Sequence, residues 1–184
     1  MIAPAEAPNL TFLGAAGTVT GSKHLVAHEG REVLLDAGLF QGLKELRRRN
    51  WEPPPVDPGR LDSVILSHGH LDHSGYLPLL VRHGFRGPVH CTPGTADLLR
   101  VVLWDAASLQ EEDATRANRY GYTKHSPALP LYGRDDVIRT LGLVRKHGYG
   151  DRFEVAPGFS ALFRRAGHIL GSATVEVRLG RAKS

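Results

Sequence analysis

The residues best suited to chemistry lie in one short segment, in which His68, His70, Asp72 and His73 follow a single apolar run. Imidazole nitrogens and carboxylate oxygens are the ligands of zinc and similar metals. Residues two apart in an extended segment point to the same side, so His68 and His70 can hold one ion together, and Gly69 permits a sharp turn between them. Asp72 and His73 follow at the turn into a helix and can face a second position nearby. The alternative, four ordinary polar residues in a turn, would carry a high desolvation cost.

A metal site needs a further ligand, and the best candidate is His168 in the segment RRAGHILGSA. It lies between two predicted strands and is flanked by Gly167 and Gly171. Alone it would be an ordinary loop residue. Together with His68 and His70 it would complete a three-nitrogen zinc site that keeps a position open for water.

Asp36 ends a predicted strand in the segment VLLDAGLFQG, and two roles are open to it. An aspartate at the carboxyl end of a strand often caps a turn. It can equally hold the free ring nitrogen of a ligand histidine and so fix its tautomer from the second shell. We favour the second role.

The elements that must position these residues can be predicted from periodicity and turn signals. Strands are expected at residues 10–13, 24–27, 33–36, 64–66, 89–91, 153–155, 161–164 and 174–179. Helices are expected at residues 43–49, 76–83, 95–119 and 135–146. In the long helix the apolar positions recur at three- and four-residue spacing: Leu98, Leu99, Val102, Leu103, Ala106 and Leu109. Three consecutive prolines exclude regular structure from the segment WEPPPVDPG.

The order of strands, helices and strands predicts an α/β layered domain. The apolar run Val64-Ile65-Leu66 suits a strand buried on both faces. The histidine segment therefore comes directly after a buried strand and before a helix, which is where open α/β sheets place their ligands.

The composition bounds the protein class. The chain has 184 residues, 41% hydrophobic and 23% charged, which is typical of one globular domain and excludes a disordered chain. No run approaches the ~20 apolar residues of a membrane span, and the N-terminus lacks the features of a signal peptide. The single cysteine, Cys91, excludes an intrachain disulfide and fits a reducing, cytoplasmic location. With ten histidines against one cysteine, a metal site must be nitrogen and oxygen ligated.

A net charge of +4 fits an anionic partner such as nucleic acid, although a solvated basic surface explains it equally well. Two sets of residues could contact a nucleic acid. The first is basic and lies on the helix predicted at 43–49, where we take solvation as the default interpretation; it comprises Lys44, Arg47, Arg48 and Arg49. The second combines aromatic rings with charge, as proteins that bind single strands do, although the flanking prolines and leucines favour packing; it comprises Tyr120, Tyr122, Lys124 and His125.

The order of these motifs resembles the metallo-β-lactamase superfamily: an aspartate after an early strand, the H-x-H-x-D-H cluster and a later histidine. The segments GAAGTVTGSKHL, LLDAGLFQG, AGHILGSA and SLQEEDATRANRYGYTKHSPALPLY further resemble its β-CASP branch, which includes RNA-processing nucleases. The resemblance covers residues 10–179. It implies an αββα sandwich and a zinc-dependent hydrolase that cleaves RNA phosphodiester bonds through a metal-bound hydroxide.

The resemblance also implies roles for individual residues. The first zinc would be bound by His68, His70 and His168, and the second by Asp72 and His73. Asp72 would also orient the attacking hydroxide, so Asp72 and His73 are the expected catalytic residues. Asp36 would hold the ring of a ligand histidine without binding the metal itself. RNA is the implied partner, with no membrane involved.

The chain departs from the family pattern at its end. The expected zinc-bridging aspartate has no equivalent, and the β-CASP lobe and the returning C-terminal segment are absent, so residues 1–184 are expected to form an incomplete domain. We therefore expect a weak dinuclear centre, a lack of efficient nuclease activity, and exposed apolar sheet and helix surface. A frameshifted gene, a gene split in two and an expression fragment all fit this pattern.

Two other functions remain open. The fold hosts many chemistries, so a small-molecule hydrolase such as a thioesterase is possible, although the segments that flank the histidines argue against it. A non-catalytic remnant or metal-binding module is also possible, and the missing aspartate favours it.

Overall fold

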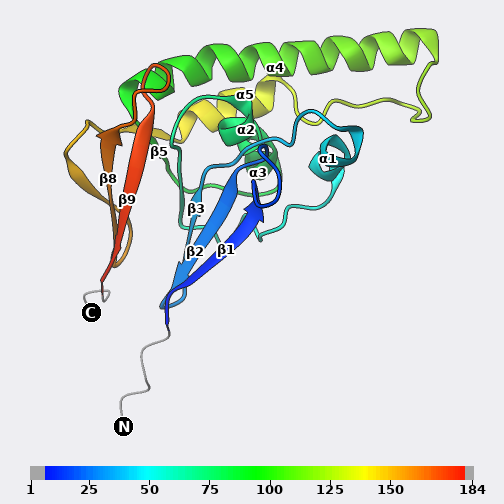
Figure 1. The fold of residues 1–184 in the computed structure, drawn as a ribbon. Coiled ribbons are helices and arrows are strands. Elements are labelled where there is room, and N and C mark those ends of the chain that lie inside the picture. The colour runs from blue at the N-terminus through cyan, green and yellow to red at the C-terminus, as the bar shows by residue number, and fades with distance from the viewer. Residues whose placement is uncertain (1–6, 181–184) are drawn as a thin grey trace.

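A computed structural model describes residues 7–180 of the chain as three layers: helices, a six-stranded sheet and a three-stranded sheet (Figure 1). The large sheet has the order β1-β2-β3-β4-β5-β6. Its strands are β1 (Asn9–Gly14), β2 (Lys23–His28), β3 (Arg31–Leu35), β4 (Ser63–Ile65), β5 (Val89–Cys91) and β6 (Val144–Lys146). The first three strands are antiparallel, and β3 to β6 run parallel.

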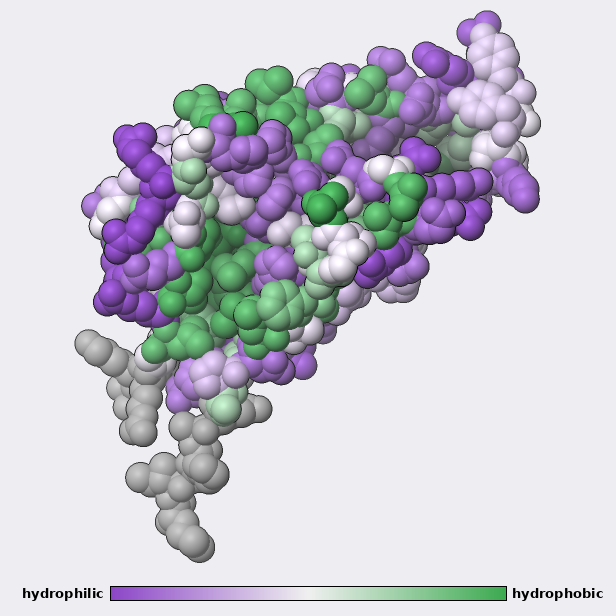
Figure 2. Space-filling model, in the orientation of Figure 1, coloured by the Kyte–Doolittle hydropathy of each residue, from purple (hydrophilic) through white to green (hydrophobic). Residues whose placement is uncertain are grey.

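The small sheet is an antiparallel meander of β7 (Arg152–Ala156), β8 (Phe159–Arg165) and β9 (Ala173–Leu179). It faces the large sheet across an apolar layer that includes Val33, Ile65, Phe159 and Phe163. Figure 2 shows hydrophobic side chains gathered where the two sheets meet. Among the described residues no helix covers the outer face of this small sheet. Residues 7–180 therefore form only one of the two helical layers of the expected αββα sandwich.

The helices are α1 (Lys44–Arg48), the short 3-10 helix η1 (Arg49–Trp51), α2 (Leu71–Ser74), α3 (Leu77–Arg82), α4 (Pro93–Tyr120) and α5 (Arg134–Gly142). A second core lies between the large sheet and the helices and includes Leu66, Tyr76, Leu80, Leu99 and Val137. The alternation Val64, Ile65, Leu66 sends side chains to both cores, as expected for a strand buried on two faces.

Helix α4 spans 28 residues, or about 42 Å at 1.5 Å per residue, and passes from the β8–β9 loop to beyond α1 (Figure 1). The Thr92 side chain caps its start by accepting from the Thr95 N–H at 3.2 Å, and Gly121 ends it in the left-handed conformation with φ +63°. Leu99 and Leu103 are buried as predicted, but Leu109 is 54% exposed, because it lies off the helix face that buries Leu103, Ala107 and Ala117. No helix of the described part is long and apolar enough to cross a bilayer.

Most predicted elements are observed, with two corrections. The helix predicted at 135–146 is wrong at its end: α5 ends at Gly142, and residues 144–146 form β6. Val144 is apolar at a helical spacing, yet it pairs with Val89 at the edge of the parallel sheet, and tertiary pairing overrides the local pattern. Helix α2 was not expected as an element of its own, because its four residues are too few for a periodic signal.

Candidate metal centre

The three histidines chosen from the sequence converge in space. His68 and His70 lie between β4 and α2, and His168 lies on the β8–β9 loop, yet one ring nitrogen of each falls within 4.8 Å of the others. His68 Nε2 is 3.1 Å from His70 Nδ1, and His168 Nε2 is 3.3 Å from the same atom. His68 is buried, whereas His70 and His168 are exposed, so the cluster opens to solvent on one side.

The donor spacing fits one metal ion. Two nitrogens bound tetrahedrally to zinc at ~2.0–2.1 Å stand about 3.3 Å apart. The observed contacts of 3.1 Å and 3.3 Å match that separation. Bare imidazole nitrogens so close together repel unless a proton or a cation lies between them. The chemistry of this set therefore suits a divalent metal with nitrogen preference.

Asp36 fixes the orientation of the ring of His73. Its Oδ2 lies 2.7 Å from His73 Nδ1, and because a carboxylate only accepts, Nδ1 carries the proton and Nε2 is left free. Asp36 itself is held at the end of β3 with φ +58° and accepts from the Ser67 N–H at 2.8 Å. Aspartate tolerates this left-handed backbone better than most residues. The interpretation favoured from the sequence, in which Asp36 holds the ring nitrogen of a histidine, requires this contact. That the histidine in turn binds a metal stays a prediction.

A second chain of hydrogen bonds passes from Asp36 through Ser67 to His68. The Ser67 hydroxyl donates to Asp36 Oδ2 at 2.9 Å and lies 3.0 Å from His68 Nδ1. Since the hydroxyl proton points to the carboxylate, the serine oxygen accepts from Nδ1–H of His68, and Nε2 of His68 faces the cluster without a proton. One buried aspartate thus sets the tautomers of two histidines.

The electrostatic environment acts on these two rings in opposite directions. Burial, helped by the neighbouring charge of His73, lowers the pKa of His68 to about 4, so this ring is neutral at neutral pH. Burial alone would also lower the pKa of His73, but the hydrogen bond and charge of Asp36, with the charge of Asp72, outweigh it and raise that pKa. A neutral imidazole is the form that binds metal.

Asp72 and His73 lie beside the three-histidine cluster but are not part of it. The rings of His68 and His73 have centroids 4.0 Å apart, and Asp72 Oδ2 is 3.8 Å from His73 Nε2. The free Nε2 of His73 and the half-buried carboxylate of Asp72 form a second donor pair. This pair is where the sequence analysis predicts a second ion.

Two glycines allow the loops around the site to approach. A Cβ at Gly38 would lie 1.6 Å from the Asp72 carbonyl oxygen, so only glycine lets the chain after Asp36 pass along α2. Gly171 has φ +78°, and a Cβ there would lie 2.1 Å from the Thr95 nitrogen. The Gly171 carbonyl accepts from Thr92 Oγ1 at 2.6 Å, which ties the loop of His168 to the start of α4.

Sequence reasoning missed three residues that support the site. Ser67 and Ser22 both donate to Asp36 Oδ2, but serine is too common for its type to be a signal, and only the position of Ser67 next to His68 could have indicated it. Lys23 is buried, donates from Nζ to the carbonyls of Gly21 and Gly38, and lies 4.5 Å from the centre of the Phe40 ring. It connects the two loops that pack against α2.

The fold and this cluster define the class of protein. A family model described as the metallo-beta-lactamase superfamily matches residues 17–159, and the chain belongs to this superfamily, as predicted from the sequence. Among solved structures, a metallo-beta-lactamase with an HARLDQ motif from Cronobacter sakazakii aligns with a TM-score of 0.55 and 21% identity, covering 95% of this chain and 56% of that one. At this identity the likeness shows the fold alone.

Two groups of relatives narrow the comparison. Ribonuclease TTHA0252 of Thermus thermophilus is 43% identical over 162 residues, which are 88% of this chain and 33% of that protein. Transcription termination factor FttA of Cenarchaeum symbiosum is 32% identical over 176 residues, 94% of this chain and 25% of that protein. The chain thus spans a quarter to a third of the length of these curated relatives.

Proposed function

We propose that the chain carries the metal centre of a zinc-dependent ribonuclease of the β-CASP type, which hydrolyses RNA phosphodiester bonds. One observation carries the proposal: the ring nitrogens of His68, His70 and His168 converge within 4.8 Å in a chain that is 43% identical to a protein named as a ribonuclease. Residues 1–184 would then be the first part of a metallo-β-lactamase-like domain.

The chemistry that zinc supplies in such a site is Lewis-acid polarisation of a phosphoryl oxygen and a lowered pKa of bound water. The protein side chains have three tasks. His68, His70 and His168 hold the ion, with their nitrogens already spaced for it. Asp36 orients His73 directly and His68 through Ser67, so the rings do not have to reorganise when metal arrives.

Asp72 is the best candidate for the base. Its carboxylate is half-buried beside the cluster, lies 3.8 Å from His73 Nε2 and makes no side-chain hydrogen bond within residues 7–180, so an oxygen is free to accept a proton from the attacking water. His73 Nε2 would share with Asp72 the binding of a second ion. With two ligands against three, we expect this second position to be the weaker one.

Zinc content and substrate cleavage test the proposal together. The purified chain is stripped with a chelator and titrated with zinc, and RNA, DNA and a model thioester are offered to it. We expect one tightly bound zinc per chain and only weak zinc-dependent cleavage, confined to RNA, because residues 1–184 are expected to lack efficient nuclease activity; both properties should be lost in His68→Ala and His70→Ala. His83→Ala is the matched control, because His83 is an exposed histidine at the end of α3, outside the cluster.

Each outcome separates one function from the others. Thioester hydrolysis without RNA cleavage would replace the proposal with a small-molecule hydrolase. Tight zinc binding with no hydrolysis of any substrate would make the chain a metal-binding module. Loss of zinc binding in His83→Ala equal to that in His68→Ala would remove the basis for assigning the cluster.

A further inference from the structure

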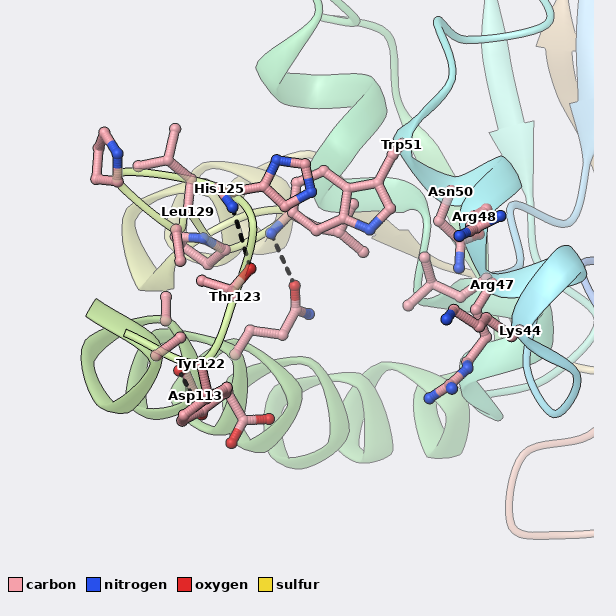
Figure 3. Close-up of a pocket in the computed structure, with 18 of the residues that line it drawn as sticks. Lys44, Arg47, Arg48, Asn50, Trp51, Asp113, Tyr122, Thr123, His125 and Leu129 are labelled. Atoms are coloured by element: carbon pink, nitrogen blue, oxygen red, sulfur yellow. Dashed lines mark hydrogen bonds between the residues drawn. The ribbon is translucent and has the colours of Figure 1, made fainter. Parts of the chain in front are cut away.

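An open groove away from the histidine cluster brings together the two sets of residues that the sequence could not assign. It has a volume of ≈ 920 Å³ and lies between the α1–η1 segment and residues 122–131, with α4 as its floor (Figure 3). Lys44, Arg47 and Arg48 line one side, and Tyr122 and His125 line the other. No residue of the histidine cluster lines it.

Both walls of the groove are fixed by paired hydrogen bonds to an asparagine. Buried Asn50 accepts from the Phe40 N–H at 2.9 Å and donates to the Phe40 carbonyl at 2.8 Å, which holds the α1–η1 segment. On the opposite wall, Asn118 of α4 accepts from the Ala128 N–H at 2.7 Å and donates to the Ala128 carbonyl at 2.9 Å. A groove with both walls held in this way loses little entropy when a ligand binds.

The charge of the groove is positive and unpaired. Lys44, Arg47 and Arg48 are exposed, and none of them makes an ion pair with any residue in the described range. Asp113 is the single carboxylate in the lining. Three free cations facing one anion attract a polyanion, and phosphate groups release counterions when they bind such a surface.

The groove also presents rings. Trp51 is 61% exposed and extends from the α1–η1 side toward the opposite loop, and Tyr122 is 62% exposed (Figure 3). Cations that follow a backbone together with rings on which bases stack are the features of single-strand binding, whereas the bases of a duplex are already stacked on each other.

We propose that this groove binds single-stranded RNA, so that a substrate strand is held at a second place, remote from the metal centre. The choice of RNA rests on the proposed ribonuclease function; the preference for a single strand rests on the rings and cations of the groove. Arg49 does not line the groove, and its guanidinium lies 4.1 Å from the centre of the Phe40 ring. Tyr120 and Lys124 do not line it either.

Fluorescence anisotropy of a labelled uridine oligonucleotide tests this proposal. Binding is measured in chelator, so that cleavage does not interfere, and repeated with a duplex of the same length. We expect the single strand to bind more tightly than the duplex. Trp51→Ala should weaken single-strand binding about tenfold, as stacking of one base implies. Arg47→Glu combined with Arg48→Glu should reduce the slope of log affinity against log salt by about 1.4, the value for two lost phosphate contacts.

Matched controls come from the same protein. Trp104→Ala removes another partly exposed tryptophan, and Arg100→Glu reverses an exposed charge on α4; neither residue lines the groove. Both should leave affinity within about twofold of the parent, well below the change expected from one stacked base. Thermal unfolding followed by circular dichroism checks that each variant folds.

Any of four binding results would overturn the proposal: no binding of the single strand, equal binding of duplex and single strand, groove variants that bind like the controls, or displacement of the RNA by polyglutamate at an equal charge concentration. The two proposals fail separately. Binding of the single strand by the parent without any zinc-dependent cleavage refutes the ribonuclease alone. Cleavage that is unaffected by the groove variants refutes the groove alone.

Discussion

A histidine pair with one buried member, His90, should make the folded state sensitive to acid. His90 of β5 is 5% exposed, and its Nδ1 lies 2.9 Å from Nε2 of His147. The ring of Phe153 stacks on His147 with centroids 3.6 Å apart. His90 Nε2 has no hydrogen-bond partner in the described part of the chain. Burial, with the charges of His147 and Arg145, lowers the pKa of His90 to about 4.

The size and sign of the effect follow from linkage. The pKa of His90 is 6.5 in the unfolded chain and about 4 in the folded one, so the unfolded state binds more protons between these values. The contribution of neutral His90 to the free energy of unfolding is therefore complete above pH 6.5 and is lost as the pH falls from there toward about 4. At 1.36 kcal/mol per pKa unit the full loss is about 3 kcal/mol, and about 2 kcal/mol of it is already lost near pH 5. Burial also lowers the pKa of His147, which acts in the same direction.

Urea unfolding followed by circular dichroism measures this loss. The parent, His90→Asn and the exposed control His83→Asn are compared at about pH 7.5 and about pH 5, in chelator so that metal binding does not contribute. Between these two pH values, the free energy of unfolding of the parent and of the control should fall by about 2 kcal/mol more than that of His90→Asn. If the free energies of unfolding of the parent and His90→Asn fall in parallel within about 0.5 kcal/mol, His90 is not the acid-sensitive group and the reasoning fails.

Three further predictions test the site and the core. Asp36→Asn should lower zinc affinity about 10–100-fold in a competition titration, because the asparagine cannot hold both His73 and Ser67 as the carboxylate does. The far-UV circular dichroism spectrum should be unchanged. An unchanged zinc affinity would show that the rings do not need Asp36 for their orientation. Gly38→Ala should lower the melting temperature and zinc affinity together, because its Cβ would overlap the Asp72 carbonyl oxygen, and a variant as stable as the parent would contradict this packing. Cys91 is buried, and burial raises the pKa of its thiol to about 12, so a thiol reagent should react with it at the rate of unfolding rather than at the rate of a free thiol.

The parts of the site that the sequence predicted are those with short-range signals. His68, His70, Asp72 and His73 are within six residues, and the spacing of His68 and His70 implies that these two side chains point to the same side. His168 was chosen for its glycine-flanked loop, and the fold brings it to His70 because β8 and β9 end beside the start of α4.

The parts that the sequence could not predict depend on long-range contacts. His90 and His147 are 57 residues apart in the chain and meet only because β5 and β6 are neighbours. The groove likewise joins residues 44–51 to residues 122–131 because α4 is long enough to carry the second segment past the first. Each set alone fits a solvated face or a packed loop, and only their juxtaposition favours a ligand.

The position of Asp36 explains why the candidate metal centre depends on the carboxyl ends of β3 and β4. Its N–H donates to the Ile65 carbonyl at 2.8 Å, which continues the pairing of β3 with β4 by one residue, and its left-handed backbone then turns the chain toward α2. The same residue accepts hydrogen bonds from Ser22, Ser67 and His73. None of these contacts needs a metal ion, so the folding of the carboxyl ends of β3 and β4 already orders the rings of His68 and His73. Zinc would therefore bind donors that are in place, and its binding energy would not be spent on ordering the loop.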